Sequence, residues 1–268
     1  MFGFGKFMLG ASALSFAKQN LDNLLVGRLL GMTQLGYYSV AFTLAHLSAE
    51  YLGVRVQRVI YPAYARIQAD AERLKPAVLK TFRYLCLIAW PFGAAVVLFG
   101  GDFLKLAYGP LWTEAAPILR ILAFAGVLNT IHVSWSGLFG ATGKPRYSFF
   151  AMSAQVSVFL VLIVPAARRY GLLGVGASVC AAAAAAFLLE LGFASRILGL
   201  PKRALASGMS IPLLASLVMG GGTVLIRRLI ARPAPAASLS IPGFVALAAA
   251  ALAIYAAAAF LLDPGLGK

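Results

Sequence analysis

The sequence predicts an all-α fold, a polytopic transmembrane helix bundle of about eight spans. The first observation is a set of seven stretches of at least eighteen residues without Asp, Glu, Lys or Arg; they are residues 29–49, 84–101, 121–143, 147–167, 170–189, 204–226 and 233–262. An eighth stretch, residues 7–27, is interrupted only by Lys18 and Asp22. A helix of about 20 apolar residues crosses the hydrocarbon core of a bilayer, so each stretch is long enough to span.

Composition and patterning are the second and third observations. Hydrophobic residues make up 61% of the chain and charged residues 12%, whereas a soluble domain has about 25% charged residues. The apolar runs are continuous and lack the period-2 alternation that is typical of a membrane β-barrel. Helices satisfy their backbone polar groups internally, as the bilayer demands. The chain is therefore predicted to be helical and membrane-embedded.

The eight helices follow from the apolar runs and from the turn residues between them. They are expected near residues 5–27, 36–57, 80–100, 115–141, 147–166, 172–195, 208–228 and 241–262. Gly31 follows the first helix, residues 109–110 (Gly-Pro) precede the fourth, and residues 143–145 (Gly-Lys-Pro) separate the fourth and fifth. The Pro-rich residues 232–235 precede the last. Glycine and proline at these places are ordinary turn signals.

The distribution of basic residues predicts the orientation. One set of loops holds fourteen Lys and Arg residues: Lys6, Arg55, Arg58, Arg66, Arg73, Lys75, Lys80, Arg83, Lys144, Arg146, Arg196, Lys202, Arg203 and Lys268. The opposite set holds seven: Arg28, Lys105, Arg168, Arg169, Arg227, Arg228 and Arg232. Cytoplasmic loops carry the excess of Lys and Arg. Both termini are therefore expected in the cytoplasm.

The longest of the cytoplasmic connections runs from residue 55 to residue 83. Val56, Ile60, Tyr64 and Ile67 recur in it at helical spacing among basic residues. This pattern is consistent with an amphipathic helix that lies in the membrane interface. A solvated basic loop is the alternative.

Motifs for catalysis, cofactors and metals are missing from the sequence. It has no phosphate-binding loop, no HExxH, no GxSxG and no paired-carboxylate motif, and it contains only eight acidic residues and two histidines. Cys86 and Cys180 lie within apolar runs and form no CxxC motif, so they are expected to be packing residues. The chain is not expected to be an enzyme or to hold a cofactor or metal. Its net charge of +15 is spread between apolar runs, which favours anionic lipid headgroups over nucleic acid as partners.

Polar residues inside the first span are candidates for a functional site. Lys18 and Asp22 are four residues apart and can pair on one face, with Asn23 in the same turn and Arg28 further along. Ionisable groups at bilayer depth usually face a bundle interior or a water-filled cavity. One interpretation is a wall of a hydrophilic substrate cavity. The other is a locally paired structural cluster near the outer membrane boundary.

Further candidates lie in the second and fourth helices. His46 and Glu50 are four residues apart and could form a titratable pair for ion coupling, or a satisfied interhelical hydrogen bond. Arg120 and Asn129 are additional cavity candidates, although their separation is too wide for one shared face contact. Glu190 is expected at the membrane boundary, near the end of the sixth helix.

Six further motifs occur in order along the chain: LDNLLVGRLLG at residues 21–31, LGYYSVA at 35–41, RVIYPAYARIQ at 58–68, YGPLW at 108–112, APILRIL at 116–122 and GATGKP at 140–145. Together they resemble the second half of the polysaccharide flippases, the Wzx-like lipopolysaccharide O-antigen branch of the multidrug/oligosaccharidyl-lipid/polysaccharide exporter superfamily. The resemblance covers most of residues 1–200.

The resemblance implies a fold of two six-helix lobes that face each other across a cavity, often with two extra helices. Residues 1–200 would be the C-terminal six-helix lobe and residues 201–268 the two additional helices, with the N-terminal lobe missing. The implied function is translocation of a lipid-pyrophosphate-linked oligosaccharide across the bacterial inner membrane for surface polysaccharide biosynthesis. Arg28 and Lys18 would offset the pyrophosphate charge. Rocking of the lobes would give alternating access, and an ion gradient could drive it.

Two alternatives accompany this expectation. The missing lobe favours a non-transporting scaffold or partner subunit of a polysaccharide assembly complex. A drug or cation antiporter of the same superfamily is the other, and the few acidic residues in the spans argue against it. The expected partners are a polyprenyl-pyrophosphate-linked oligosaccharide, membrane lipids, and an N-terminal lobe or glycan assembly proteins.

Overall fold

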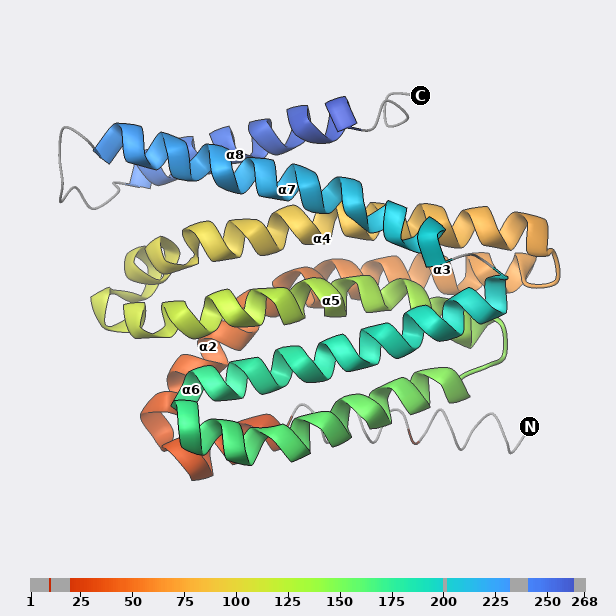
Figure 1. Ribbon diagram of the computed structural model, residues 1–268, viewed down its shortest axis with the longest axis horizontal. Helices are drawn as coiled ribbons and strands as arrows, with labels where there is room; N and C mark the ends of the chain where they lie inside the picture. The colour runs from red at the N-terminus through yellow and green to blue at the C-terminus, as the bar shows by residue number, and fades with distance from the viewer. Residues whose placement is uncertain (1–9, 11–19, 200–201, 232–240, 263–268) are drawn as a thin grey trace.

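Long helices run back and forth along one axis of the molecule (Figure 1). The computed structural model describes residue 10 and residues 20–199, 202–231 and 241–262. Residues 20–30 are helical, and the labelled helices are α2 Met32–Ser48, α3 Val54–Ile67, α4 Ala71–Tyr108, α5 Ala116–Ala141, α6 Arg146–Leu198, α7 Lys202–Ala231 and α8 Ile241–Leu262. A π-helical turn, Ala49–Gly53, joins α2 to α3, and a 3₁₀ turn, Pro110–Ala115, precedes α5.

Five helical stretches of the described residues are long and apolar enough to cross a membrane. They are Ala71–Tyr108, Pro110–Ala141, Arg146–Leu198, Ser207–Leu229 and Ile241–Leu262. The third breaks at Gly171, which has φ 57° and ψ −136°, a conformation that glycine adopts without a steric penalty. Its two halves run in opposite directions in Figure 1. They correspond to the predicted helices at 147–166 and 172–195. The first predicted helix, 5–27, lies mostly outside the described residues.

The second predicted helix, 36–57, is part of a longer helical run. α2, the π-helical turn and α3 follow one another over residues 32–67 and keep one general direction. The amphipathic segment after residue 55 is therefore helical, and the solvated-loop alternative is wrong. α3 does not form a separate helix beside the bundle, because its buried Ile60 packs against Gly137 of α5. A Cβ at Gly137 would lie 2.9 Å from Ile60 Cδ1.

The third predicted helix, 80–100, is too short at both ends. α4 begins at Ala71, where the Asp70 side chain caps it by accepting a hydrogen bond from the Arg73 backbone amide at 3.1 Å. Asp is a favoured N-cap residue because its carboxylate satisfies a free amide of the first turn. The charged residues of 72–83 bound the apolar run without ending the helix. At 1.5 Å per residue, α4 is about 57 Å long, well beyond the hydrocarbon thickness of about 30 Å.

Residues 20–198 share one main apolar core, which includes the buried side chains of Tyr38, Phe82, Trp135 and Phe139. α5 lies in its middle, against α2, α3, α4 and α6. The α2–α5 crossing depends on Gly126, because a Cβ there would lie 1.9 Å from the backbone oxygen of Ala45. Small residues permit this close approach of helix backbones in membranes.

α7 and α8 pack on α4, at the edge of the molecule (Figure 1). Leu205, near the start of α7, joins the main core. The other buried contacts of α7 and α8 form two small separate clusters, one around Phe99 and Met219 and one around Ala215 and Ala258. Two polar contacts also hold them. Arg227 of α7 pairs with Asp102 of α4 at 2.5 Å, and the Tyr255 hydroxyl of α8 donates to the Leu87 carbonyl at 2.8 Å.

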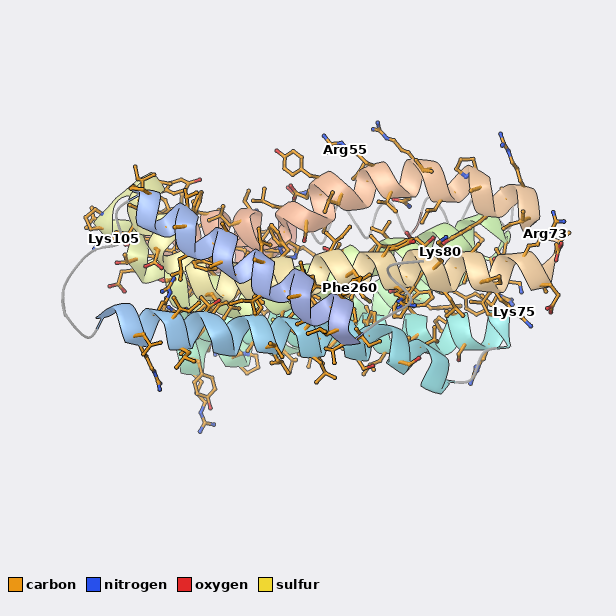
Figure 2. The ribbon with its side chains drawn as sticks, turned by 90° about the horizontal axis from the view of Figure 1, so that it is seen from above. Arg55, Arg73, Lys75, Lys80, Lys105 and Phe260 are labelled. Atoms are coloured by element: carbon orange, nitrogen blue, oxygen red, sulfur yellow. The ribbon has the colours of Figure 1, made fainter. Side chains whose placement is uncertain are left out.

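Basic side chains gather at one end of the long axis. Arg73 and Lys75 lie at that end in Figure 2, and Lys105 lies at the other. The same basic end contains the α3–α4 turn, the α5–α6 turn at residues 142–145 and the end of α6. Arg55, which belongs to the same predicted loop set as Arg73 and Lys75, lies near the middle of the long axis in Figure 2, so the two loop sets are only partly separated to opposite ends.

Candidate functional site

The predicted polar cluster of the first helix divides between the interior and the surface. Asp22 is only 6% exposed, and its Oδ2 accepts a hydrogen bond from the Tyr38 hydroxyl of α2 at 2.8 Å. Asn23 and Arg28 are exposed. Lys18, the predicted partner of Asp22, lies outside the described residues. Asp22 thus ties the first helix to α2, and so does Asn23, whose Oδ1 accepts a hydrogen bond from the Ser39 hydroxyl at 3.5 Å.

His46 and Asn129 meet inside the bundle, between α2 and α5. Asn129 Nδ2 lies 2.9 Å from the Ala125 carbonyl and 3.1 Å from His46 Nε2. His46 Nδ1 lies 3.0 Å from the Phe42 carbonyl. A carbonyl can only accept, so Nδ1 carries the proton and Nε2 accepts from Asn129, which assigns a neutral imidazole. Glu50, the predicted coupling partner of His46, is exposed on the π-helical turn.

Arg120 is placed apart from the other candidates. Its side chain lines a cleft of about 360 Å³ between α4, α5 and α7, with Trp90, Phe124 and Leu217 among its mostly apolar neighbours. The structure therefore joins Asn129 to His46 and puts Arg120 in a different environment. The six predicted cavity residues do not form one cluster within the described part of the chain.

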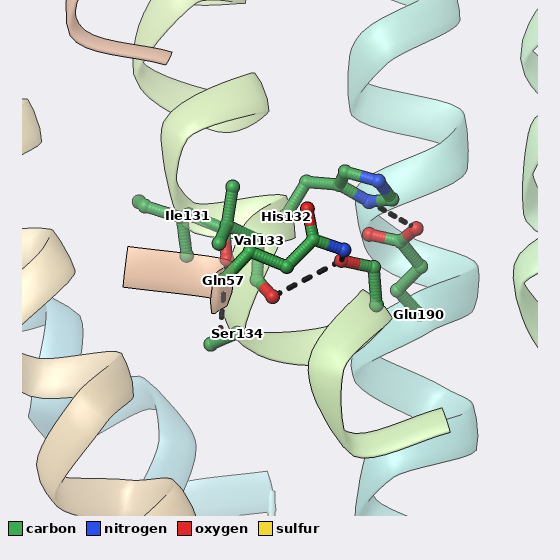
Figure 3. A network of polar contacts seen from close by, with 7 residues as sticks. Gln57, Ile131, His132, Val133, Ser134 and Glu190 are labelled. Carbon is green, nitrogen blue, oxygen red and sulfur yellow. Dashed lines mark hydrogen bonds and ion pairs between the residues drawn. The ribbon is translucent and has the colours of Figure 1, made fainter. Parts of the chain in front are cut away.

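A buried acid–imidazole pair was not predicted from the sequence. His132 Nδ1 of α5 lies 2.5 Å from Glu190 Oε1 of α6, as Figure 3 shows. Glu190 is 1% exposed, so its carboxylate is buried between helices; its expected place at the membrane boundary stays a prediction. The carboxylate faces inward because Ala183, Ala186 and Phe187 turn the same side of α6 toward the core. The available signal was an ionisable residue in each of two spans, but neither helix alone indicates the partner.

An exposed polar stripe runs along the outer side of the α2–α3 run. Glu50, Tyr51, Arg55 and Arg58 are all exposed. Tyr51, Arg55 and Arg58 follow one another at spacings of four and three residues, which places these three on neighbouring positions of one helix face; Glu50 directly precedes Tyr51. Arg55 Nη1 donates to the Tyr51 carbonyl at 3.3 Å, and Arg55 projects away from the other helices in Figure 2. Sequence reasoning had assigned these arginines to loops, because it ended the second span at residue 57.

Comparison with known proteins shows which of them this chain is similar to. Residues 1–117 match the profile of a family described as "Polysaccharide biosynthesis protein". This chain resembles that family over its first 117 of 268 residues. It is 27% identical to the lipopolysaccharide biosynthesis protein WzxC of Escherichia coli K12, over 64% of this chain and 35% of that protein. It is 25% identical to the teichuronic acid biosynthesis protein TuaB of Bacillus subtilis 168, over 82% of this chain and 45% of that protein.

The fold of this chain is similar to that of a solved flippase structure. The structure of the lipid II flippase MurJ in an inward closed conformation matches with a TM-score of 0.78 at 15% identity, over 96% of this chain and 53% of that one. The chain thus spans about half or less of the proteins it matches. It is a multi-pass membrane protein with a MurJ-like helical bundle.

Proposed function

We propose that this chain forms one lobe of a flippase that moves a polyprenyl-pyrophosphate-linked oligosaccharide across the bacterial inner membrane for surface polysaccharide biosynthesis. Residues 1–200 form the six-helix lobe, residues 201–268 add two further spans, and both termini lie in the cytoplasm. The names of WzxC, TuaB and MurJ support this class of cargo. The observation that carries the proposal is the exposed polar stripe of α2 and α3.

The stripe is costly if it faces lipid. A charged side chain at the centre of a membrane helix costs about 2.5–3.5 kcal/mol even by the lowest scales. Glu50, Arg55 and Arg58 are nevertheless exposed, and Arg55 projects away from the other helices in Figure 2. Val54 and Val59 are exposed beside these charges, whereas the outer faces of α6, α7 and α8 show mainly exposed Leu, Val and Phe side chains. The stripe therefore borders an aqueous cavity, whose opposite wall a second lobe supplies.

The charges of this wall suit a glycan joined to pyrophosphate. Arg55 and Arg58 offer guanidinium groups, which bind phosphate oxygens by paired charge-assisted hydrogen bonds. Asn23 and Tyr51 offer neutral polar groups to sugar hydroxyls. Arg28 is also exposed, and it lies near the end of the first helix, just before α2 begins. A lobe with cations at two depths can hold the pyrophosphate before and after the crossing, while the lipid tail stays in the bilayer.

The test is binding of a short-chain polyprenyl pyrophosphate to the full chain in lipid nanodiscs. Arg55→Ala and Arg58→Ala are each expected to weaken binding by about tenfold, the equivalent of about 1.4 kcal/mol. Arg169→Ala, an exposed arginine beside Gly171, is the matched control and should leave binding unchanged. Equal binding by all variants would remove the stripe from the site. No binding, together with copurification of glycan assembly proteins, would favour the scaffold function.

A further inference from the structure

Glu190 and His132 form a buried titratable pair that the flippase cavity does not include. The Oε1–Nδ1 separation is 2.5 Å, and the two residues come from different helices, α5 and α6 (Figure 3). His132 lies nine residues before the end of α5 and Glu190 eight before the end of α6. At 1.5 Å per residue, both sit about 12–14 Å inside the helix ends. The pair therefore lies inside two helical stretches that are long and apolar enough to cross a membrane.

A small cavity adjoins the pair. Its volume is about 140 Å³, and Asn129, Met152, Gln155 and Phe187 line it together with His132 and Glu190. A water molecule occupies about 30 Å³ in the liquid, so the cavity can hold a few. The His132 side chain is 32% exposed, whereas that of Glu190 is 2% exposed. His132 thus connects a buried carboxylate with the outside of the bundle.

The pair has a form with net charge −1 and a neutral form, and these two forms differ by one proton. Neutral His132 that donates from Nδ1 to the Glu190 carboxylate gives a net charge of −1. One added proton gives either imidazolium with carboxylate or imidazole with carboxylic acid, and both are neutral overall. A neutral pair is favoured in an apolar medium. The site therefore has the chemistry to take up and release a single proton.

The described ionisable groups on the neighbouring elements lie outside the cavity that adjoins the pair. On the α2 side, His46 is separated from the cavity by Asn129. On the side of the first helix, Asp22 lines a neighbouring small void with Gln155. Across α5, Gln57 of α3 is bound to Ser136, and Phe82 of α4 packs on Trp135. Among the described residues that line the cavity, His132 and Glu190 are the two that titrate.

We propose that His132 and Glu190 are the proton-binding site of the lobe, and, resting on the proposed function, that this proton is the ion coupled to glycan movement. One carboxylate and one imidazole suit a proton better than a hard cation, which takes six to eight oxygen ligands. Binding of the proton makes the pair between α5 and α6 neutral. Release of the proton leaves a net negative charge there and draws water into the cavity, which changes the preferred packing of the two helices.

Infrared titration of the full chain in nanodiscs tests proton binding without any glycan. A carbonyl band of a protonated buried carboxylic acid is expected to rise and fall with pH in the wild type. Glu190→Gln should abolish that band, and His132→Gln should shift its midpoint. Glu114→Gln, which alters an exposed acid of the 3₁₀ turn Pro110–Ala115, should leave it unchanged. A titrating band that persists in Glu190→Gln, or a wild type without one, would overturn the proposal.

A second measurement separates proton binding from a purely structural hydrogen bond and from the flippase function. The wild type should show a pH-dependent melting temperature, and Glu190→Gln should make it independent of pH around the infrared midpoint. A uniform drop at every pH would assign the pair a structural role and overturn the site. Polyprenyl pyrophosphate binding by the same samples reports on the proposed function separately, because Glu190→Gln leaves Arg55 and Arg58 in place.

Discussion

The bundle of residues 20–198 and the α7–α8 pair are both built from apolar helices, but the two regions differ in how much of each helix is buried. In the most apolar part of each helix, 67% of the α5 stretch is buried inside the protein, against 28% of α7 and 22% of α8. The bundle also keeps its polar contacts inside, at Asp22–Tyr38, Asn129–His46 and His132–Glu190. The two polar contacts that hold α7 and α8, Arg227–Asp102 and Tyr255–Leu87, instead lie where these helices meet α4.

This difference indicates a division of labour. Lipid tails are as apolar as Leu, so an exposed apolar helix face loses little in the membrane. A polar group exposed to the same tails is costly. The bundle therefore has a specific interior that must be closed around its polar contacts, whereas α7 and α8 can be held by a few contacts. Mutations in the two regions should differ in size accordingly.

The largest effect is expected at the centre of the bundle. Gly126→Ala places a Cβ 1.9 Å from the Ala45 backbone oxygen, and neither backbone can move without opening the α2–α5 crossing. The cost should reach or exceed about 3 kcal/mol, the upper end of overpacking effects. Thermal melting in nanodiscs measures it. Gly36→Ala, where a Cβ meets no atom within 4 Å, is the control, and equal melting temperatures for both variants would contradict the prediction.

Removal of one tyrosine hydroxyl from each region compares the two directly. Tyr38→Phe deletes the bond to the buried Asp22 carboxyl and should cost about 1.5–3 kcal/mol, the range for a bond to a charged group. Tyr255→Phe deletes a bond to the neutral Leu87 carbonyl and should cost about 1 kcal/mol. Chemical unfolding of both variants gives the two values. A larger loss for Tyr255→Phe would reverse the comparison.

The smallest effect is expected where α7 meets α4. Asp102→Asn keeps the shape of the side chain and removes the charge that pairs with Arg227; both side chains are 31% exposed. A partly exposed ion pair contributes about 0–1 kcal/mol. The loss should shrink as salt is raised, because the pair is screened. A salt-independent loss above about 2 kcal/mol would show that α7 is held as specifically as the bundle.

The sequence was sufficient for most of the helical layout. The uninterrupted apolar runs predicted helices that the structure contains, and the turns at Gly109 and at residues 143–145 fall between helices as expected. The apolar runs predicted helices shorter than the α2–α3 run and α4, because charged residues end an apolar run but do not end a helix. The Asp70 cap marks where α4 begins, and capping is a local signal that hydropathy does not weigh.

What the sequence by itself determined is that this chain is helical, lies in a membrane and carries its positive charge mainly at one end. Each of these follows from the solvent: lipid requires long apolar helices, and charge collects where they leave it. Only the tertiary structure decided which polar residues meet and which face outward. Glu190 is 58 residues from His132, and helical periodicity relates positions on one helix, never on two. Arg58 faces outward because α3 continues α2, a direction that depends on its packing against α5.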